Sequence, residues 1–156
     1  MKTGDGVDEA VRRHPFLEGF APMFFDALCD CVSIHRFTSQ QQIFQEGGEA
    51  DYFYLIVSGE VALETFVPGW GMVTIQILGA GDALGWSSLF PPHDWQFTAT
   101  TREPTEVISL NAARLRRIAE ADHEFDCELL TRAAKTLYQR LLGTRKHLVE
   151  LYGMRR

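Results

Sequence analysis

The sequence predicts a mainly β domain, a small closed barrel or jelly roll flanked by short helices and completed by a long C-terminal helix. Between about residues 34 and 110, apolar residues recur in short runs with the period of two that is typical of strands. Turns rich in glycine separate these runs. After residue 122 the period becomes helical and stays so to about residue 152. About eight short strands with such turns are typical of a barrel or jelly roll.

Length and composition limit the chain to one compact domain. With 156 residues, of which 46% are apolar and 12% aromatic, it has enough apolar surface for one core. No segment reaches the ~20 apolar residues that span a bilayer, and the residues after Met1 lack an apolar secretory segment. We therefore expect a cytoplasmic protein. Its three cysteines, Cys29, Cys31 and Cys127, are expected to be core or near-surface residues.

The chain divides into three parts. Residues 1–13 precede the first helix signal and are expected to be flexible. Residues 14–121 are expected to form the β domain with its flanking helices, and Pro15 and Pro22 each begin a short helix because proline is favoured in the first helical turn. Residues 122–153 are expected to form the long helix.

Apolar runs between turns predict the individual strands. The runs cover residues 34–37, 43–44, 52–57, 61–67, 72–78, 95–100 and 106–110. Asn111 is placed to cap a short helix that follows the last strand, and Asp122 is placed to cap the long helix.

The long helix carries an apolar seam. Seven of its residues are spaced 4, 3, 4, 3, 4, 3, which is the a/d pattern of a coiled coil: Leu130, Ala134, Leu137, Leu141, Thr144, Leu148 and Leu151. A second set lies beside them: Leu129, Ala133, Tyr138 and Leu142. We expect the second set to contact the β domain and the seam to contact a second copy of the chain, which gives a homodimer. In the alternative, the seam also packs on its own β domain.

The net charge of −6 is unevenly distributed. Residues 127–156 carry seven basic and two acidic residues, whereas residues 1–126 carry eight basic and 19 acidic ones. An acidic body disfavours nucleic acid as a partner, because the phosphate backbone is bound by Lys and Arg. The basic helix is typical of a solvated face, and it is the one candidate surface for an acidic partner.

The sequence contains no arrangement of residues that predicts catalysis. The five histidines are scattered, without the paired spacing of metal-binding barrels. The His93-Asp94 pair follows two prolines and is typical of a solvated turn rather than a catalytic dyad. There is no CxxC and no glycine-rich nucleotide loop of either common kind. We expect no enzyme activity, no metal and no cofactor.

Three segments in a fixed order resemble the cyclic-nucleotide-binding domain family, the sensor half of catabolite-activator-type regulators. They are residues 43–59, with Gly47, Asp51 and Gly59; residues 79–85, which read Gly-Ala-Gly-Asp-Ala-Leu-Gly; and Phe97-Thr98-Ala99. The resemblance covers nearly the whole chain from Phe16. It implies an eight-stranded β-roll, a phosphate-binding cassette between strands six and seven, and a long helix that dimerises and covers the pocket.

The resemblance assigns a degenerate cassette to this chain. The candidate pocket residues are Gly85, Trp86, Ser87, Ser88, Trp95, Phe97, Thr98 and Ala99, with Thr144 and Arg145 on the covering helix. The family has a glutamate for the ribose at the position of Trp86 and an arginine for the cyclic phosphate at the position of Phe97. The nearest unassigned cation is Arg102. We therefore expect cyclic AMP and cyclic GMP to bind weakly or not at all.

Three uses of the altered pocket remain open. Trp86, Trp95 and Phe97 fill the old cavity, or they line a pocket for a flatter and less charged ligand, or the site still responds to nucleotides. The expected function is that of a homodimeric regulatory sensor. One alternative is an accessory protein-interaction subunit of a larger redox complex, such as an NAD-reducing hydrogenase. The other is a transcription-regulator sensor domain without its DNA-binding half, since the chain ends soon after the long helix.

Overall fold

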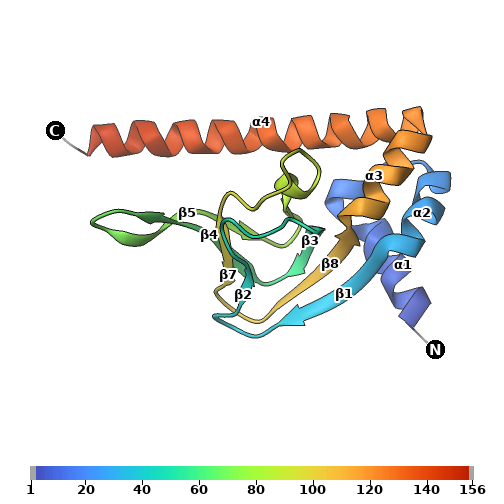
Figure 1. The fold of residues 1–156 in the computed structure, drawn as a ribbon, viewed down its shortest axis with the longest axis horizontal. Coiled ribbons are helices and arrows are strands. Elements are labelled where there is room, and N and C mark those ends of the chain that lie inside the picture. The colour runs from blue at the N-terminus through green and yellow to red at the C-terminus, as the bar shows by residue number, and fades with distance from the viewer. Residues whose placement is uncertain (1–2, 155–156) are drawn as a thin grey trace.

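The computed structural model describes residues 3–154 and confirms the predicted β-roll. Two antiparallel sheets of four strands face each other, helices gather at one end, and one long helix crosses the molecule (Figure 1). The first sheet has the strand order β1 (Val32–Phe37), β8 (Thr105–Asn111), β3 (Tyr52–Ser58), β6 (Ala83–Leu84). The second has the order β2 (Gln42–Phe44), β7 (Thr98–Thr101), β4 (Glu60–Val67), β5 (Gly71–Gly79).

The alternation of side chains along β3 divides the core into two parts. Phe53 and Leu55 point to a layer that we call the helix-side core, which lies between the first sheet and the helices. Tyr54 and Ile56 point the other way into the roll interior, between the two sheets. Because all residues from 53 to 56 are buried, β3 is apolar on both faces.

The N-terminal segment is a helix rather than the flexible segment expected from the sequence. Helix α1 covers Thr3–Arg13. Val7, Ala10 and Val11 recur at helical spacing and pack on the helix-side core. This apolar face is too short to stand out in the sequence. The 3-10 helix η1 (Pro15–Leu17), α2 (Pro22–Leu28) and the 3-10 helix η2 (Cys29–Cys31) follow, with both prolines in first helical turns as predicted.

Both predicted caps of the C-terminal helices are confirmed. The Asn111 side chain accepts the N–H of Arg114 at the start of α3 (Ala112–Ala121). The Asp122 carboxylate accepts the N–H groups of Glu124 and Phe125 at the start of α4 (His123–Gly153). These bonds satisfy donors that a helix start leaves unpaired.

The fully buried residues of the long helix α4 all lie in its first third. Phe125, Leu129 and Ala133 are buried in the helix-side core. Tyr138 and Leu142, which were expected to continue this contact, are exposed, as is every residue from 141 to 154. Figure 1 shows that α4 passes over the roll, and that its C-terminal half projects in the same direction as the β4–β5 hairpin. No helix in the described part of the chain is long and apolar enough to cross a membrane.

Candidate functional site

The segment that corresponds to the cassette begins directly after β6 with Gly85, which no other residue can replace without strain. Gly85 has φ +96° and precedes the 3-10 helix η3 (Trp86–Ser88). A Cβ atom at Gly85 would lie 2.9 Å from the Tyr52 carbonyl oxygen and 3.2 Å from the Trp95 ring. Within η3, the buried Ser88 hydroxyl donates to the Gly85 carbonyl oxygen at 2.7 Å, whereas Ser87 is half-buried.

An aromatic stack occupies the roll interior beside this glycine. Trp95 lies parallel to Phe44 with ring centroids 3.7 Å apart, and Tyr54 stacks at 6.4 Å on Trp95. Burial raises the pKa of Tyr54 to about 12, so its hydroxyl stays protonated at neutral pH. Of the three aromatic residues expected to fill or line the pocket, Trp95 is the one that lies in the roll interior.

The Trp86 side chain points away from the roll interior, toward the helices. Its indole is buried in the helix-side core, with ring centroids 4.8 Å from Phe53 and 5.6 Å from Phe16. The sequence led us to expect this side chain in the pocket at the place of the family's glutamate. The structure differs because Phe16 and Phe53 form an apolar site for the indole behind η3. The indole Nε1 is buried there without a hydrogen-bond partner among the described residues.

A cation that the sequence analysis did not select lies over this indole. The Arg140 Cζ atom is 5.9 Å from the Trp86 ring centroid. Burial lowers the pKa of Arg140 to about 10, opposed by the negative charge of Asp82, so Arg140 remains a cation at neutral pH. Its position was readable from the sequence. Arg140 lies seven residues, or two helical turns, beyond the buried Ala133 and therefore on the same face of α4.

The other predicted pocket residues lie at the start of β7. Ala99 is fully buried in the roll interior, and Thr98 is buried with its hydroxyl oxygen accepting the Glu46 N–H at 3.1 Å. Phe97 is 40% exposed and belongs to neither core. Arg102 lies beyond the end of β7 and is paired with Glu60 at 3.7 Å.

The predicted covering residues Thr144 and Arg145 lie on the exposed part of α4. The Thr144 hydroxyl donates to the Arg140 carbonyl oxygen at 2.9 Å. Within this one chain, the cation of α4 that lies against the cassette is Arg140. All seven seam residues are exposed in the single chain, which leaves the seam available for a second copy.

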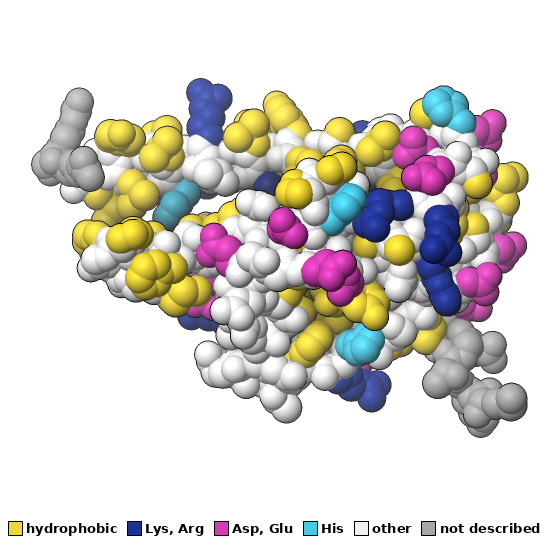
Figure 2. Space-filling model, in the orientation of Figure 1, with side chains coloured by type: hydrophobic (Ala, Val, Ile, Leu, Met, Phe, Trp, Pro, Cys, Tyr) yellow, Lys and Arg dark blue, Asp and Glu magenta, His cyan; other side chains and the backbone are white. Residues whose placement is uncertain are grey.

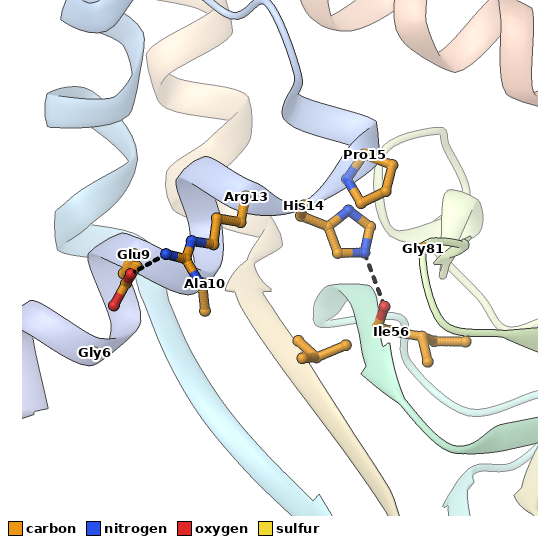
Figure 3. Close-up of a pocket in the computed structure, with 9 residues that line it drawn as sticks. Gly6, Glu9, Ala10, Arg13, His14, Pro15, Ile56 and Gly81 are labelled. Atoms are coloured by element: carbon orange, nitrogen blue, oxygen red, sulfur yellow. Dashed lines mark hydrogen bonds and ion pairs between the residues drawn. The ribbon is translucent and has the colours of Figure 1, made fainter.

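A hollow of about 320 Å³ lies between α1 and β3, away from the cassette (Figure 3). Its polar side chains are already paired. Arg13 forms an ion pair with Glu9 at 2.6 Å, and the His14 Nε2 lies 2.9 Å from the Ile56 carbonyl oxygen. The His14 Nδ1 accepts the N–H of Phe16, so Nε2 must carry the proton that is donated to Ile56. The neutral imidazole therefore ties α1 to β3.

This buried histidine predicts a loss of stability in mild acid. Burial lowers the pKa of His14 below its ordinary value of 6.5, against the opposing effects of Ile56 and Asp82. Below pH 6.5 the imidazole of His14 binds a proton in the unfolded chain but stays neutral in the folded chain. The free energy of unfolding therefore falls, by at most about 1.4 kcal/mol per pH unit, until the folded pKa is reached. Urea unfolding between about pH 7.5 and 5 measures this slope.

The matched variants are His14→Gln and His35→Gln, which remove a buried and an exposed imidazole respectively. We expect His14→Gln to flatten the profile and His35→Gln to leave it unchanged. Superimposable profiles for the wild type and His14→Gln would contradict the assignment.

Neither the cysteines nor the acidic residues form a metal site in the part of the chain that the structure describes. Cys31 lies in the helix-side core as predicted, and burial raises its pKa to about 11. Cys29 and Cys127 are exposed, and all three cysteines are free.

The sequence profile of the cyclic nucleotide-binding domain matches residues 34–122. The chain belongs to this family. It is 28% identical to the CRP-like cAMP-activated global transcriptional regulator of Mycobacterium tuberculosis over 145 residues, which are 93% of this chain and 63% of that protein. The chain thus spans less than two thirds of the length of this relative.

Solved structures agree with the family fold. A putative cyclic nucleotide-binding protein from Geobacter metallireducens superposes with a TM-score of 0.76 at 25% identity, over 86% of this chain and 97% of that one. A cyclic nucleotide-binding domain from Methylobacillus flagellatus superposes with a TM-score of 0.83 at 21% identity, over 95% and 85% of the two chains, and shows the fold alone.

Proposed function

We infer that this chain is a non-enzymatic, homodimeric regulatory module of the cyclic nucleotide-binding family that binds cyclic AMP and cyclic GMP weakly or not at all. The observation that carries this proposal is the position of Trp95. Its ring lies against Gly85 and stacks on Phe44, in the interior space beside the cassette backbone. A nucleotide seated there would have to displace a buried aromatic stack.

Charge supports the same conclusion. The resemblance places the phosphate-binding arginine of the family at Phe97 and its ribose-binding glutamate at Trp86. Each charge-assisted hydrogen bond that is lost removes roughly 1.5–3 kcal/mol, which is about tenfold to hundredfold in affinity. Arg102, the nearest unassigned cation, lies beyond the end of β7 and is paired with Glu60.

Calorimetric titration with cyclic AMP and cyclic GMP tests the proposal. We expect dissociation constants in the millimolar range or no measurable heat, because the two charged contacts are missing and the interior is filled. Micromolar binding of either nucleotide would overturn the proposal.

A gain-of-function variant tests the physical reason. Phe97→Arg places a cation at an exposed position, so its cost to stability is small. We expect cyclic-nucleotide binding to strengthen about tenfold if the missing charge is the main defect. An unchanged affinity would assign the defect to the aromatic stack instead.

The exposed seam supports the dimer. Leu137, Leu141, Leu148 and Leu151 remain exposed in the single chain. Figure 2 shows apolar side chains along the projecting half of α4 and on the end of the hairpin formed by β4 and β5. Burying each leucine contributes roughly 1.5–3 kcal/mol, which is sufficient for a stable pair of helices.

A second candidate function is that of an accessory subunit that docks on another protein. The observation that favours it is the β4–β5 hairpin, where Trp70 is 83% exposed at the turn and Phe66 and Met72 are exposed beside it. Exposed tryptophan is typical of the centres of protein interfaces. A monomer in solution with an unresponsive cassette would favour this candidate over the regulatory dimer.

A further inference from the structure

Two buried hydrogen-bond donors meet between η3 and α4 without an acceptor. The Trp86 Nε1 and the Arg140 Nη2 are both buried, and neither has a hydrogen-bond partner within residues 3–154. The Arg140 Cζ lies 5.9 Å from the Trp86 ring centroid, so the guanidinium lies over the face of the indole. Both groups can only donate, so neither can satisfy the other. Buried donors in proteins are nearly always paired, so each of these two requires an acceptor.

The charge at this site is also unbalanced. None of the ion pairs formed within the described chain includes Arg140. The negative charge of Asp82 raises the pKa of Arg140 from nearby, but the two side chains form no ion pair in the described part of the chain. Along α4 beyond Glu128 the sole acidic residue is Glu150, about 15 Å farther along the axis. A second α4 packed in parallel on the seam therefore brings no carboxylate to the level of Arg140.

We propose, within the regulatory function inferred above, that Trp86 and Arg140 bind the terminal phosphate of a small molecule between the cassette and α4. The guanidinium presents parallel N–H groups that match an oxyanion, and the indole adds a further donor. A terminal phosphate carries about −1.5 to −2 charges at pH 7, whereas the phosphodiester of a cyclic nucleotide carries one. The side chain of Trp86 faces the helix-side core, so the aromatic stack in the roll interior does not occupy this position.

A phosphate at this site would connect two parts that otherwise touch little. Arg140 lies two turns beyond Ala133, the last buried residue of α4. A ligand held by both Trp86 and Arg140 would fix the middle of α4 to η3. Arg140 lies directly beside the seam residue Leu141 in the sequence. Binding would therefore favour one position of α4 over others, which is the differential affinity that a signal requires.

Thermal unfolding and calorimetry with inorganic phosphate, AMP, adenosine and cyclic AMP test this site. We expect phosphate and AMP at millimolar concentration to raise the Tm of the wild type, and adenosine to leave it unchanged. Arg140→Met keeps the apolar stem and removes the charge, and should weaken AMP binding at least tenfold. Lys146→Met also removes a positive charge, from an exposed position of α4 outside the predicted pocket, and should bind AMP as the wild type does.

Trp86→Phe provides a second variant that keeps a ring in the helix-side core but removes the N–H donor. It should also weaken AMP binding, with a smaller loss than Arg140→Met. The site would be overturned by a wild type that does not respond to phosphate or AMP. It would also be overturned if Arg140→Met bound AMP as tightly as the control variant on the exposed face of α4. Failure of the regulatory function itself is read separately, from micromolar cyclic-nucleotide binding or from a monomeric wild type in sedimentation.

Discussion

Replacing Leu137 and Leu141 together by aspartate should convert a homodimer into a monomer. Both residues lie in the seam of α4, and Leu141 is 65% exposed in the single chain. The substitutions therefore cost the isolated fold little. In a dimer they would place four carboxylates into an apolar contact and remove four leucines, each of which contributes roughly 1.5–3 kcal/mol. Sedimentation velocity at micromolar concentration should give about twice 17.7 kDa for the wild type and about 17.7 kDa for the variant.

The matched control places aspartate on the opposite face of the same helix. Gln139→Asp with Lys146→Asp adds at least as much negative charge at exposed positions and costs similar helix propensity. We expect this variant to remain dimeric. A wild type that sediments as a monomer, or equal dissociation of both double variants, would refute the seam.

The parts of the fold that are governed by local patterns were predictable from the sequence. Alternation and turn residues predicted seven of the eight strands, and missed β6 because it has only two residues. Asn111 and Asp122 form the expected caps because their side-chain oxygens accept N–H groups that a helix start leaves unpaired. Helix α1 was missed because only Val7, Ala10 and Val11 form its apolar face, and their burial depends on contacts with residues distant in sequence.

The candidate site was predictable only in outline. The order of motifs predicted where the cassette lies in the chain, and Trp95, one of its predicted pocket residues, is buried in the roll interior. The direction of Trp86 was not readable, because it depends on Phe16 and Phe53 leaving an apolar site on the far side of η3. Arg140 was overlooked because the charge was assigned to a solvated helix face, although its spacing from Ala133 placed it on the buried side.

These two side chains change how the regulatory fold would work in this chain. The resemblance to the family implies a ligand pocket that the cassette forms and the long helix covers. Here the Trp86 side chain of the cassette points away from the roll interior, and the Arg140 guanidinium of α4 lies over its ring. Under the proposed function, the aromatic stack beside Gly85 would stabilise the roll interior, and the contact between η3 and α4 would carry the signal.

Phe125→Ala should be the most destabilising single substitution in α4. The Phe125 ring is fully buried, and its centroid lies 5.6 Å from that of Phe20 and 5.4 Å from that of Phe24, both in edge-on geometry. Removing a buried phenylalanine costs about 3–5 kcal/mol. That is a large share of the 5–15 kcal/mol that stabilises a typical domain. At about 2–4 °C per kcal/mol for a chain of this size, the Tm should fall by roughly 10 °C.

The control removes the same side chain from a solvent-facing position. Phe66 is 62% exposed on β4, and Phe66→Ala should change the free energy of unfolding by no more than about 0.5 kcal/mol. Only three residues of α4 are buried, so the first third of the helix supports the projecting remainder. Loss of Phe125 should therefore release α4 from the N-terminal helices and weaken any signal that depends on its position. A loss of less than about 1 kcal/mol would mean that contacts farther along α4, such as that of Arg140 with Trp86, hold the helix in place.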